Sequence, residues 1–164
     1  MILVVAYATA MGLLEAICVV YLRHLLLPVG GGQIEVAALN RYPIELWREA
    51  STIVMLVVVG WLAGTSPATR FGCFLAAFGI WDIWYYAGLY VWTGWPGSLL
   101  EWDCLFLMPC PWYGPVLAPV LISLSFIVSC ICLIVAERAG QGIRWQMVQA
   151  DGRLHLVAVL SSWS

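Results

Sequence analysis

Apolar residues fall in four long runs, separated by shorter stretches that are rich in polar residues, glycine and proline. The runs cover residues 2–27, 46–62, 71–93 and 116–136. A helix needs about 20 mostly apolar residues to cross a hydrocarbon core about 30 Å thick. The pattern therefore predicts an all-α membrane protein with a four-helix transmembrane bundle over residues 1–136. A cytoplasmic or interfacial tail is expected over residues 137–164.

The first run could also be a secretory signal peptide. It lacks a basic segment at its start, is longer than the apolar core of a signal peptide, and continues through YLRHLL without a small-residue cleavage site. We therefore expect residues 2–27 to form a spanning helix.

The connection between the third and fourth runs, GWPGSLLEWDCLFLMPCPWYGP, is too apolar for a freely solvated linker. It is also too short, and too often interrupted by proline, to cross a membrane. Irregular backbone at membrane depth occurs only where protein or water covers it. The sequence thus predicts an interfacial or re-entrant segment that caps the bundle.

Prolines and turn residues predict further local features. Pro43 is expected at the start of the second helix, because proline is tolerated in the first turn. Pro119 predicts a kink early in the fourth helix, with Ser123 as a partner for the freed backbone groups. The tail is compatible with a short hairpin around Asp151-Gly152 or with an amphipathic interfacial helix from Ile143.

Composition agrees with a bilayer protein. Hydrophobic residues make up 63% of the chain and charged residues 10%, and the mean hydropathy is +0.95. All seven basic residues are arginines without a basic patch, which argues against nucleic-acid partners. Four of them, Arg70, Arg138, Arg144 and Arg153, lie on the side of the termini in a four-span topology. This small excess predicts an inner (cytoplasmic) membrane protein with both termini in the cytoplasm.

Two acidic residues lie in the middle of predicted helices. Asp82 is at the centre of the third run, and Glu15 has a similar position in the first. A charged side chain at the bilayer centre costs about 2.5–3.5 kcal/mol on insertion scales, so such residues normally face the bundle interior. We expect both carboxyl groups to point inward and to meet at mid-depth.

Residues three and four positions apart share a helix face. With this spacing, each acid belongs to a strip of residues on one face of its helix. The third helix carries Gly79, Asp82, Tyr86, Tyr90 and Thr93, the second carries Glu45, Arg48, Glu49 and Thr52, and the first carries Ala8, Gly12 and Ala16 beside Glu15. The small residues of the first helix have the spacing that allows close helix approach.

The strips predict a water-accessible polar centre that binds a proton or cation. Its residues would be Glu15, Asp82, Glu49, Arg48, Glu45 and Tyr86. Arg48 is expected to pair with Asp82, or more simply with Glu45 or Glu49. The alternative is that the acids are protonated, hydrogen-bonded and purely structural.

Metal and cofactor chemistry is weakly indicated, and no cofactor is expected. Cys104, Met108 and Cys110 in the third connection form a set that suits Cu(I), because soft sulfur ligands select this ion. A disulfide between Cys104 and Cys110, or two free thiols, accounts for the same residues. Cys18, Cys73, Cys130 and Cys132 fall inside predicted helices, where cysteine is ordinarily a small hydrophobe.

Other cofactors and catalytic groups have less support. The aromatic third helix could stack a quinone or pigment ring, although such residues more often form core and interface. The chain has no Glu-x-x-His pair for a di-iron site, and its two histidines, His24 and His155, are poorly placed for a haem. It also lacks a G-x-S-x-G motif.

Four segments carry a resemblance to a known family. WDIWYY, GWPGSLLEWD, MPCPWYGPVLAPV and RYPIELWREASTIVML resemble a family of uncharacterised bacterial multi-pass membrane proteins. The resemblance covers residues 12–123. It implies an integral membrane location and carries no activity.

Three functions fit these features. The preferred one is a non-enzymatic subunit of a membrane complex or a homo-oligomer with a buried carboxylate cluster, because no catalytic constellation is present. The second is a proton- or cation-handling transport module that uses Asp82 and Glu15. The third is a membrane-embedded enzyme acting on lipid or quinone, with Asp82 as a general base.

Overall fold

The computed structural model describes residues 1–26, 34–107 and 111–138. It contains the helices α1 (Ile2–Leu26), α2 (Ile34–Ala63), α3 (Pro67–Thr93) and α4 (Leu117–Arg138), and the strands β1 (Trp102–Phe106) and β2 (Trp112–Pro115). All four helices are long and apolar enough to cross a membrane. The predicted four-helix membrane bundle, with a structured segment between the third and fourth helices, is confirmed. The tail lies outside the described residues.

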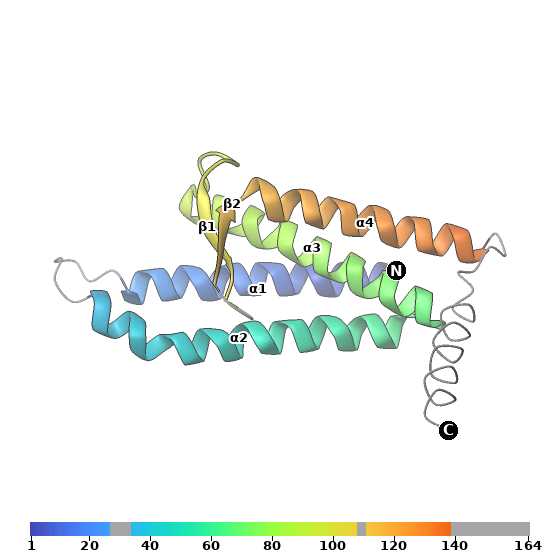
Figure 1. The fold of residues 1–164 in the computed structure, drawn as a ribbon, viewed down its shortest axis with the longest axis horizontal. Helices are drawn as coiled ribbons and strands as arrows, with labels where there is room; N and C mark the ends of the chain where they lie inside the picture. The colour runs from blue at the N-terminus through green and yellow to red at the C-terminus, as the bar shows by residue number, and fades with distance from the viewer. Residues whose placement is uncertain (27–33, 108–110, 139–164) are drawn as a thin grey trace, which may run out of the picture.

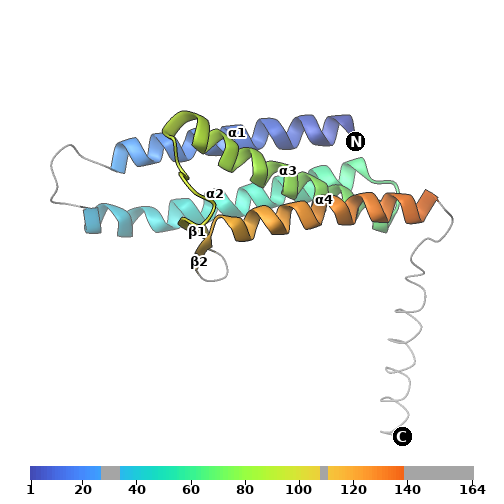
Figure 2. The same cartoon turned by 90° about the horizontal axis from the view of Figure 1, so that it is seen from above.

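Helix α3 is the centre of the bundle. It crosses the others obliquely and packs against α1, α2 and α4 (Figures 1 and 2). The start of α1 and the end of α4 lie at the same end of the bundle, as four alternating spans require (Figure 1). The buried side chains of α3 therefore face three different helices.

Glycines bring the backbones close together at each interface of α3. A Cβ atom built on Gly12 of α1 would overlap the carbonyl oxygen of Trp81. One on Gly60 of α2 would lie 2.7 Å from the Cα atom of Phe74, and one on Gly79 of α3 would lie 2.5 Å from the Ser123 carbonyl oxygen. Helix association in lipid depends on this close packing, because the lipid is as apolar as the side chains.

The small-residue strip predicted on the first helix lies at the interface between α1 and α3. Ala8 and Ala16 are fully buried, and Ala16 packs against Gly88 of α3. Ala8 belongs to a compact apolar core with Val4, Met11, Leu56, Ala77 and Trp81. The core joins α1, α2 and α3.

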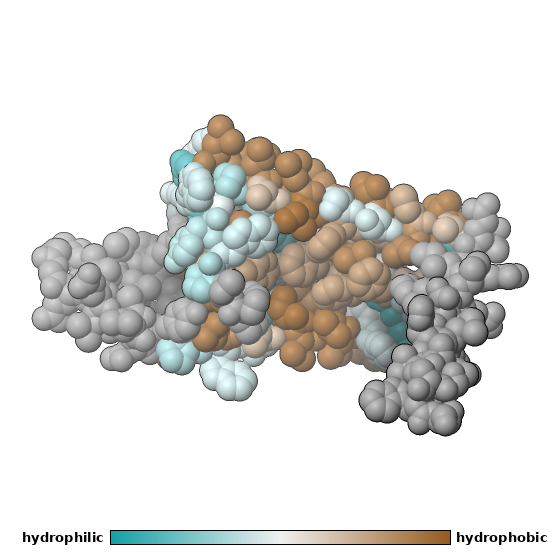
Figure 3. All heavy atoms as spheres, in the orientation of Figure 1, coloured by the Kyte–Doolittle hydropathy of each residue, from teal (hydrophilic) through white to brown (hydrophobic). Residues whose placement is uncertain are grey.

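The outer faces of the helices are apolar and exposed. Large exposed hydrophobic residues include Leu14, Val54, Val58, Leu121, Leu124, Val128 and Val135. In the view of Figure 3 the hydrophobic side chains cover the middle of the bundle and much of α4, and less hydrophobic ones gather around the hairpin. This distribution suits helices whose outer faces contact lipid acyl chains.

The short turn between α2 and α3 is fixed by local bonds. Ser66 caps α3 by accepting a hydrogen bond from the Thr69 amide, and the Thr69 hydroxyl accepts one from the Ser66 amide. Pro67 occupies the first turn, where no amide donor is needed. At the same end of the bundle the Arg70 guanidinium lies 4.3 Å from the ring centre of Trp61.

The predicted position of Pro43 and the predicted partner at Pro119 are wrong, whereas the kink at Pro119 stays a prediction. Helix α2 begins at Ile34, so Pro43 lies inside it, although the candidate membrane span does start at Pro43. The loss of one backbone donor at Pro43 is compatible with a helix that continues on both sides. Pro119 lies in the first turn of α4, where its missing amide has no helical acceptor, and the Ser123 hydroxyl bonds to Asp82 rather than to a freed backbone group.

The segment between α3 and α4 forms an antiparallel hairpin of β1 and β2, with an irregular register between Cys104 and Phe106. It crosses the bundle near the end of α3 and the start of α4 (Figure 1). Phe106 stacks on Phe78 of α3, with ring centres 5.9 Å apart. Trp102 and Trp112 remain exposed, as expected of aromatic residues at a membrane interface.

Candidate functional site

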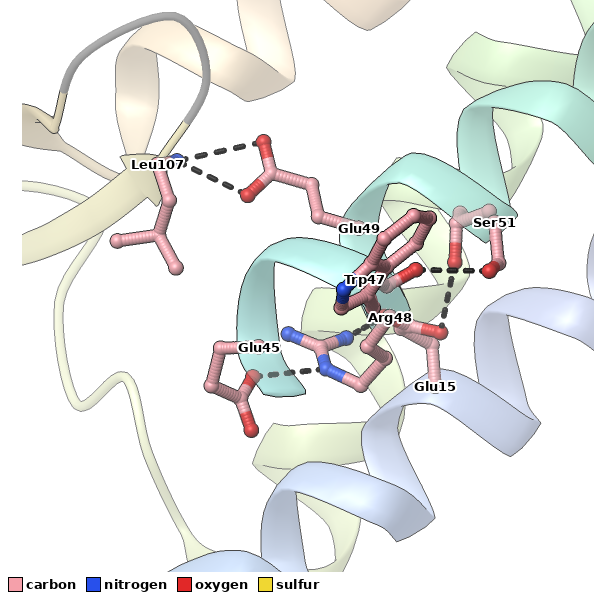
Figure 4. Close-up of polar contacts among 8 residues, drawn as sticks. Glu15, Glu45, Trp47, Arg48, Glu49, Ser51 and Leu107 are labelled. Carbon is pink, nitrogen blue, oxygen red and sulfur yellow. Dashed lines mark hydrogen bonds and ion pairs between the residues drawn. The ribbon is translucent and has the colours of Figure 1, made fainter. Parts of the chain in front are cut away.

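The first polar cluster joins α1 to α2 (Figure 4). Glu15 of α1 is buried and forms an ion pair with Arg48 of α2. The Thr52 hydroxyl donates a hydrogen bond to the Glu15 carboxylate at 3.3 Å, and Arg48 Nε donates one to Glu45 at 2.8 Å. We call Glu15, Glu45, Arg48 and Thr52 the Glu15 cluster.

The α2 members of this cluster share one helix face because they are three and four residues apart. That face is buried or half-buried, as the sequence pattern predicted. Glu15 lies between Gly12 and Ala16, which hold α1 tightly against α3. Because α1 packs closely against α3, the position along α2 that the Glu15 carboxylate can reach is fixed.

The second polar cluster lies between α3, α4 and the hairpin. Asp82 is 4% exposed and accepts a hydrogen bond of 2.8 Å from the hydroxyl of Ser123, which is fully buried. One helical turn further along α3, the Tyr86 hydroxyl donates to Asp103 of β1 at 3.2 Å. We call Asp82, Ser123, Tyr86 and Asp103 the Asp82 cluster.

Glu49 holds the hairpin from the side of α2. The backbone amide of Leu107 donates to both Glu49 carboxylate oxygens, at 3.0 and 3.3 Å. In Figure 4 the Glu49 side chain points toward Leu107 and away from Glu45. The hairpin is therefore attached to α2 by Glu49 and to α3 by Tyr86 and Phe78.

The expectation that Glu15 and Asp82 meet is not borne out by their contacts. Among the described residues, no hydrogen bond or ion pair joins them. Helix α3 presents Trp81, Trp84 and Gly88 to α1, whereas Asp82 bonds to Ser123 of α4. Because α3 is central, its inward residues point to different neighbours, and each acid has its own partner.

The predicted pairing of Arg48 with Asp82 is wrong, and the simpler pairing with Glu45 is confirmed. The ion pair between Arg48 and Glu15 was not anticipated. Glu15 lies six residues before the end of the first candidate span and Arg48 five residues after the start of the second, so both are at a similar distance from the same end. The apolar runs read from the sequence, 2–27 and 46–62, do not show this equivalence.

Only the first three residues of the polar strip of α3 are buried. Gly79, Asp82 and Tyr86 are buried, but Tyr90 is 60% exposed and the Thr93 hydroxyl donates back to the Leu89 carbonyl. The strip therefore ends at Tyr86. Beyond that point the same helix face is no longer covered by another element.

The aromatic residues of α3 contact one another and the hairpin. Phe78 lies edge-on to Trp81, with ring centres 5.4 Å apart, and Trp81 stacks on Tyr85 at 6.3 Å. These contacts match the core interpretation of the aromatic pattern. A stacked quinone or pigment stays a prediction.

The proposed sulfur ligands of the third connection are only partly described. Cys104 is a half-buried free thiol on β1, whereas Met108 and Cys110 lie outside the described residues. Burial raises the pKa of the Cys104 thiol, and nearby Asp103 and Glu49 act in the same direction, against a hydrogen bond with Tyr113. The Cu(I) site and the disulfide both stay predictions. In the described ranges no group of three histidine, cysteine or acidic residues could hold a metal ion.

The fold and the clusters define the protein as a small multi-span helical membrane protein with a few buried carboxylates. Comparison with protein-family models, curated proteins and solved structures found no match. The membrane class therefore depends on the helices themselves and on their apolar outer faces.

Proposed function

We propose that the protein is a non-enzymatic subunit of a membrane complex, or a homo-oligomer, whose buried carboxylates fix the packing of its helices. One observation carries this proposal. Each of the buried acids Glu15, Glu49 and Asp82 accepts a hydrogen bond from a different element of the fold. Their bonds connect α1 with α2, α2 with the hairpin, and α3 with α4.

Such bonds suit a structural role in lipid. Interhelical hydrogen bonds in membranes contribute about 0.6 kcal/mol on average and up to about 2 kcal/mol. Buried polar groups can also select one helix register among several, because a shifted register would leave a carboxyl group unpaired. The acids of this protein would then specify a single bundle that presents a defined outer face to a partner.

We also propose an orientation in the inner membrane, with both termini in the cytoplasm and the hairpin on the opposite side. The excess of arginine on the side of the termini supports it. A reporter that is active only outside the cytoplasm, fused to the C-terminus, should be silent. The same reporter inserted between α1 and α2 should be active, and the reverse result would overturn the orientation.

Purification in mild detergent tests the subunit proposal. Native mass spectrometry should find the 18.1 kDa chain with a second subunit at fixed stoichiometry, or as a multiple of itself. Asp82→Asn should at most weaken this association, because an amide still accepts the Ser123 hydroxyl. A homogeneous monomer, in detergent and after dilution into excess lipid, would contradict the proposal.

A proton- or cation-handling module is the second candidate. It is supported by the Glu15 cluster, where two carboxylates share the single arginine Arg48 and Glu45 Oε1 is buried without a hydrogen-bond partner among the described residues. The formal charge of the three side chains is −1, which a bound proton or cation would neutralise.

Proteoliposomes carrying a pH-sensitive dye test this second candidate. Proton flux should be measurable with the unaltered protein and lost in Glu15→Gln, Glu45→Gln and Asp82→Asn. Glu101→Gln is the matched control, because the Glu101 carboxylate accepts a hydrogen bond from the Gly97 amide in the loop after α3 and belongs to neither cluster. The absence of flux from the unaltered protein would reject the candidate.

A further inference from the structure

Three sulfur-containing residues lie at the end of the bundle where α1 begins. The thiol of Cys73 on α3 lies 4.0 Å from the thioether sulfur of Met1. Cys130 of α4 lies beside the same turn of α3, because its sulfur is 3.7 Å from a Cβ atom built on Gly72, the residue before Cys73.

The three residues differ in their burial. Cys73 is 4% exposed and Cys130 is 1% exposed, whereas Met1 is 54% exposed. The two cysteines thus lie inside the bundle, whereas Met1 extends to its surface. The methionine side chain is flexible, so it can adjust its position when an ion binds.

We propose that Met1, Cys73 and Cys130 form a binding site for Cu(I), with two thiolates and one thioether as ligands. Soft sulfur ligands select this ion, and a neutral thioether is a poor ligand for harder cations. A trigonal site with metal–sulfur bonds of about 2.3 Å, the value for zinc thiolates, has sulfur atoms about 4.0 Å apart. The separation of Met1 and Cys73 already has this value.

Binding would release protons. The thiolate, not the thiol, is the metal ligand, so one Cu(I) ion replaces one proton on Cys73 and one on Cys130. The copper ion keeps its oxidation state, and the site gains a formal charge of −1. Proton release is therefore a second quantity that can be measured beside copper binding.

This site differs from the sulfur set predicted in the third connection, which includes Cys104 on β1 near the opposite ends of α3 and α4. It also excludes the other cysteine of α4. Cys132 is exposed and lies about 200° around α4 from Cys130, so it points away from α3. Cys132→Ser is therefore a matched control for Cys130→Ser.

The experiment uses the full chain, purified in detergent under anaerobic reducing conditions and titrated with Cu(I) against a colorimetric chelator. We expect one tightly bound ion per chain and two protons released per ion. Cys73→Ser and Cys130→Ser should each weaken binding at least tenfold, whereas Cys132→Ser and Cys104→Ser should not change it. Size-exclusion profiles identify any variant that fails to fold.

X-ray absorption at the copper edge tests Met1 without a substitution at this position. The copper ion should have three sulfur neighbours, and selenomethionine-labelled Cys104→Ser protein should show one selenium neighbour. Loss of binding in Cys104→Ser with retention in Cys73→Ser and Cys130→Ser would overturn the proposal. So would the absence of a stoichiometric ion, which would mean that the three sulfur atoms only pack together.

Discussion

Glu15 on α1 and Arg48 on α2 form an ion pair inside the bundle, and Glu45 shares the same guanidinium. The pair links two helices that otherwise have a small interface with each other, because both pack mainly on α3. Removing one member of a buried pair leaves an unpaired charge. The free-energy cost of this unpaired charge is larger than the net stabilisation that the intact pair provides.

Arg48→Met should therefore destabilise the bundle strongly. We expect a loss of about 3 kcal/mol in the free energy of unfolding, the lower end of the range for a broken buried pair. The lower end applies because 29% of the Arg48 side chain is exposed. Unfolding in mixed micelles of increasing SDS content measures the difference.

Arg70→Met is the control for this substitution, because Arg70 lies over the exposed ring of Trp61 and should contribute about 0.5–1 kcal/mol. The double variant Glu15→Gln/Arg48→Met should recover part of the loss, since it removes both charges of the pair. Equal stabilities of Arg48→Met and Arg70→Met would show that the ion pair does not hold α1 to α2.

Close packing between α3 and α4 predicts a second effect. Gly79→Ala places a Cβ atom 2.5 Å from the Ser123 carbonyl oxygen, so the helices must separate. We expect a loss of about 1–3 kcal/mol from overpacking, in spite of a gain of about 1 kcal/mol in helix propensity. The same SDS titration measures this change.

Gly72→Ala is the matched control on the same helix. Its Cβ atom would meet the side chain of Leu133 at 3.5 Å, an ordinary contact. The control should be neutral or stabilising by up to about 1 kcal/mol, because alanine favours the helix. Similar losses in both variants would mean that close approach is not specific to Gly79.

The hydrogen bond between Ser123 and Asp82 predicts a third effect. Ser123→Ala leaves the buried carboxyl group without this donor and should cost about 1–3 kcal/mol. Ser125→Ala should cost less than about 0.5 kcal/mol, because its exposed hydroxyl bonds back to the Ile122 carbonyl. A loss of equal size at both serines would indicate a general effect of α4 rather than the bond to Asp82.

Sequence patterns were sufficient for the spans and for the burial of the acids. The four helices, the structured third connection, the inward position of Glu15 and Asp82 and the small-residue strip on α1 all follow from length, hydrophobicity and helical spacing. These features depend on single helices. They do not require knowledge of which helices are neighbours.

The partners of the acids do require that knowledge. Asp82 bonds to Ser123, forty-one residues away, because α3 is central and turns this face to α4. The hairpin contacts with Glu49 and Tyr86 depend on a loop that folds back across the bundle. Nor could the sequence indicate that the sulfur of Cys73 lies near that of Met1, seventy-two residues away.

Glu49 provides a direct test of how the hairpin is held. In Glu49→Ala the Leu107 amide loses its carboxylate acceptor. Bonds to charged groups contribute about 1.5–3 kcal/mol, so hydrogen exchange at this amide should become at least tenfold faster. Glu49→Gln, which keeps one acceptor oxygen, should have an intermediate rate.

The amide of Arg70 is the internal reference for these exchange rates. It donates to the Ser66 carbonyl at the far end of α3 and should exchange at the same rate in all variants. Unchanged exchange at Leu107 in Glu49→Ala would show that other contacts, such as Phe106 on Phe78, hold the hairpin alone.

The Cys104 thiol predicts a pH dependence on the hairpin. Burial disfavours the thiolate and raises the pKa, and the negative charges of Asp103 and Glu49 add to this effect. Only the thiolate reacts with iodoacetamide, so alkylation at pH 8 should be slower than that of free cysteine, and the rate should rise at a higher pH.

A variant in which Cys104 is the only cysteine allows the rate to be measured from pH 7 to 11. Unfolding in SDS should restore the rate of free cysteine, and Glu49→Gln should shift the profile toward lower pH. A native rate at pH 8 that equals the unfolded rate would mean that the thiol is not held in the buried position on β1.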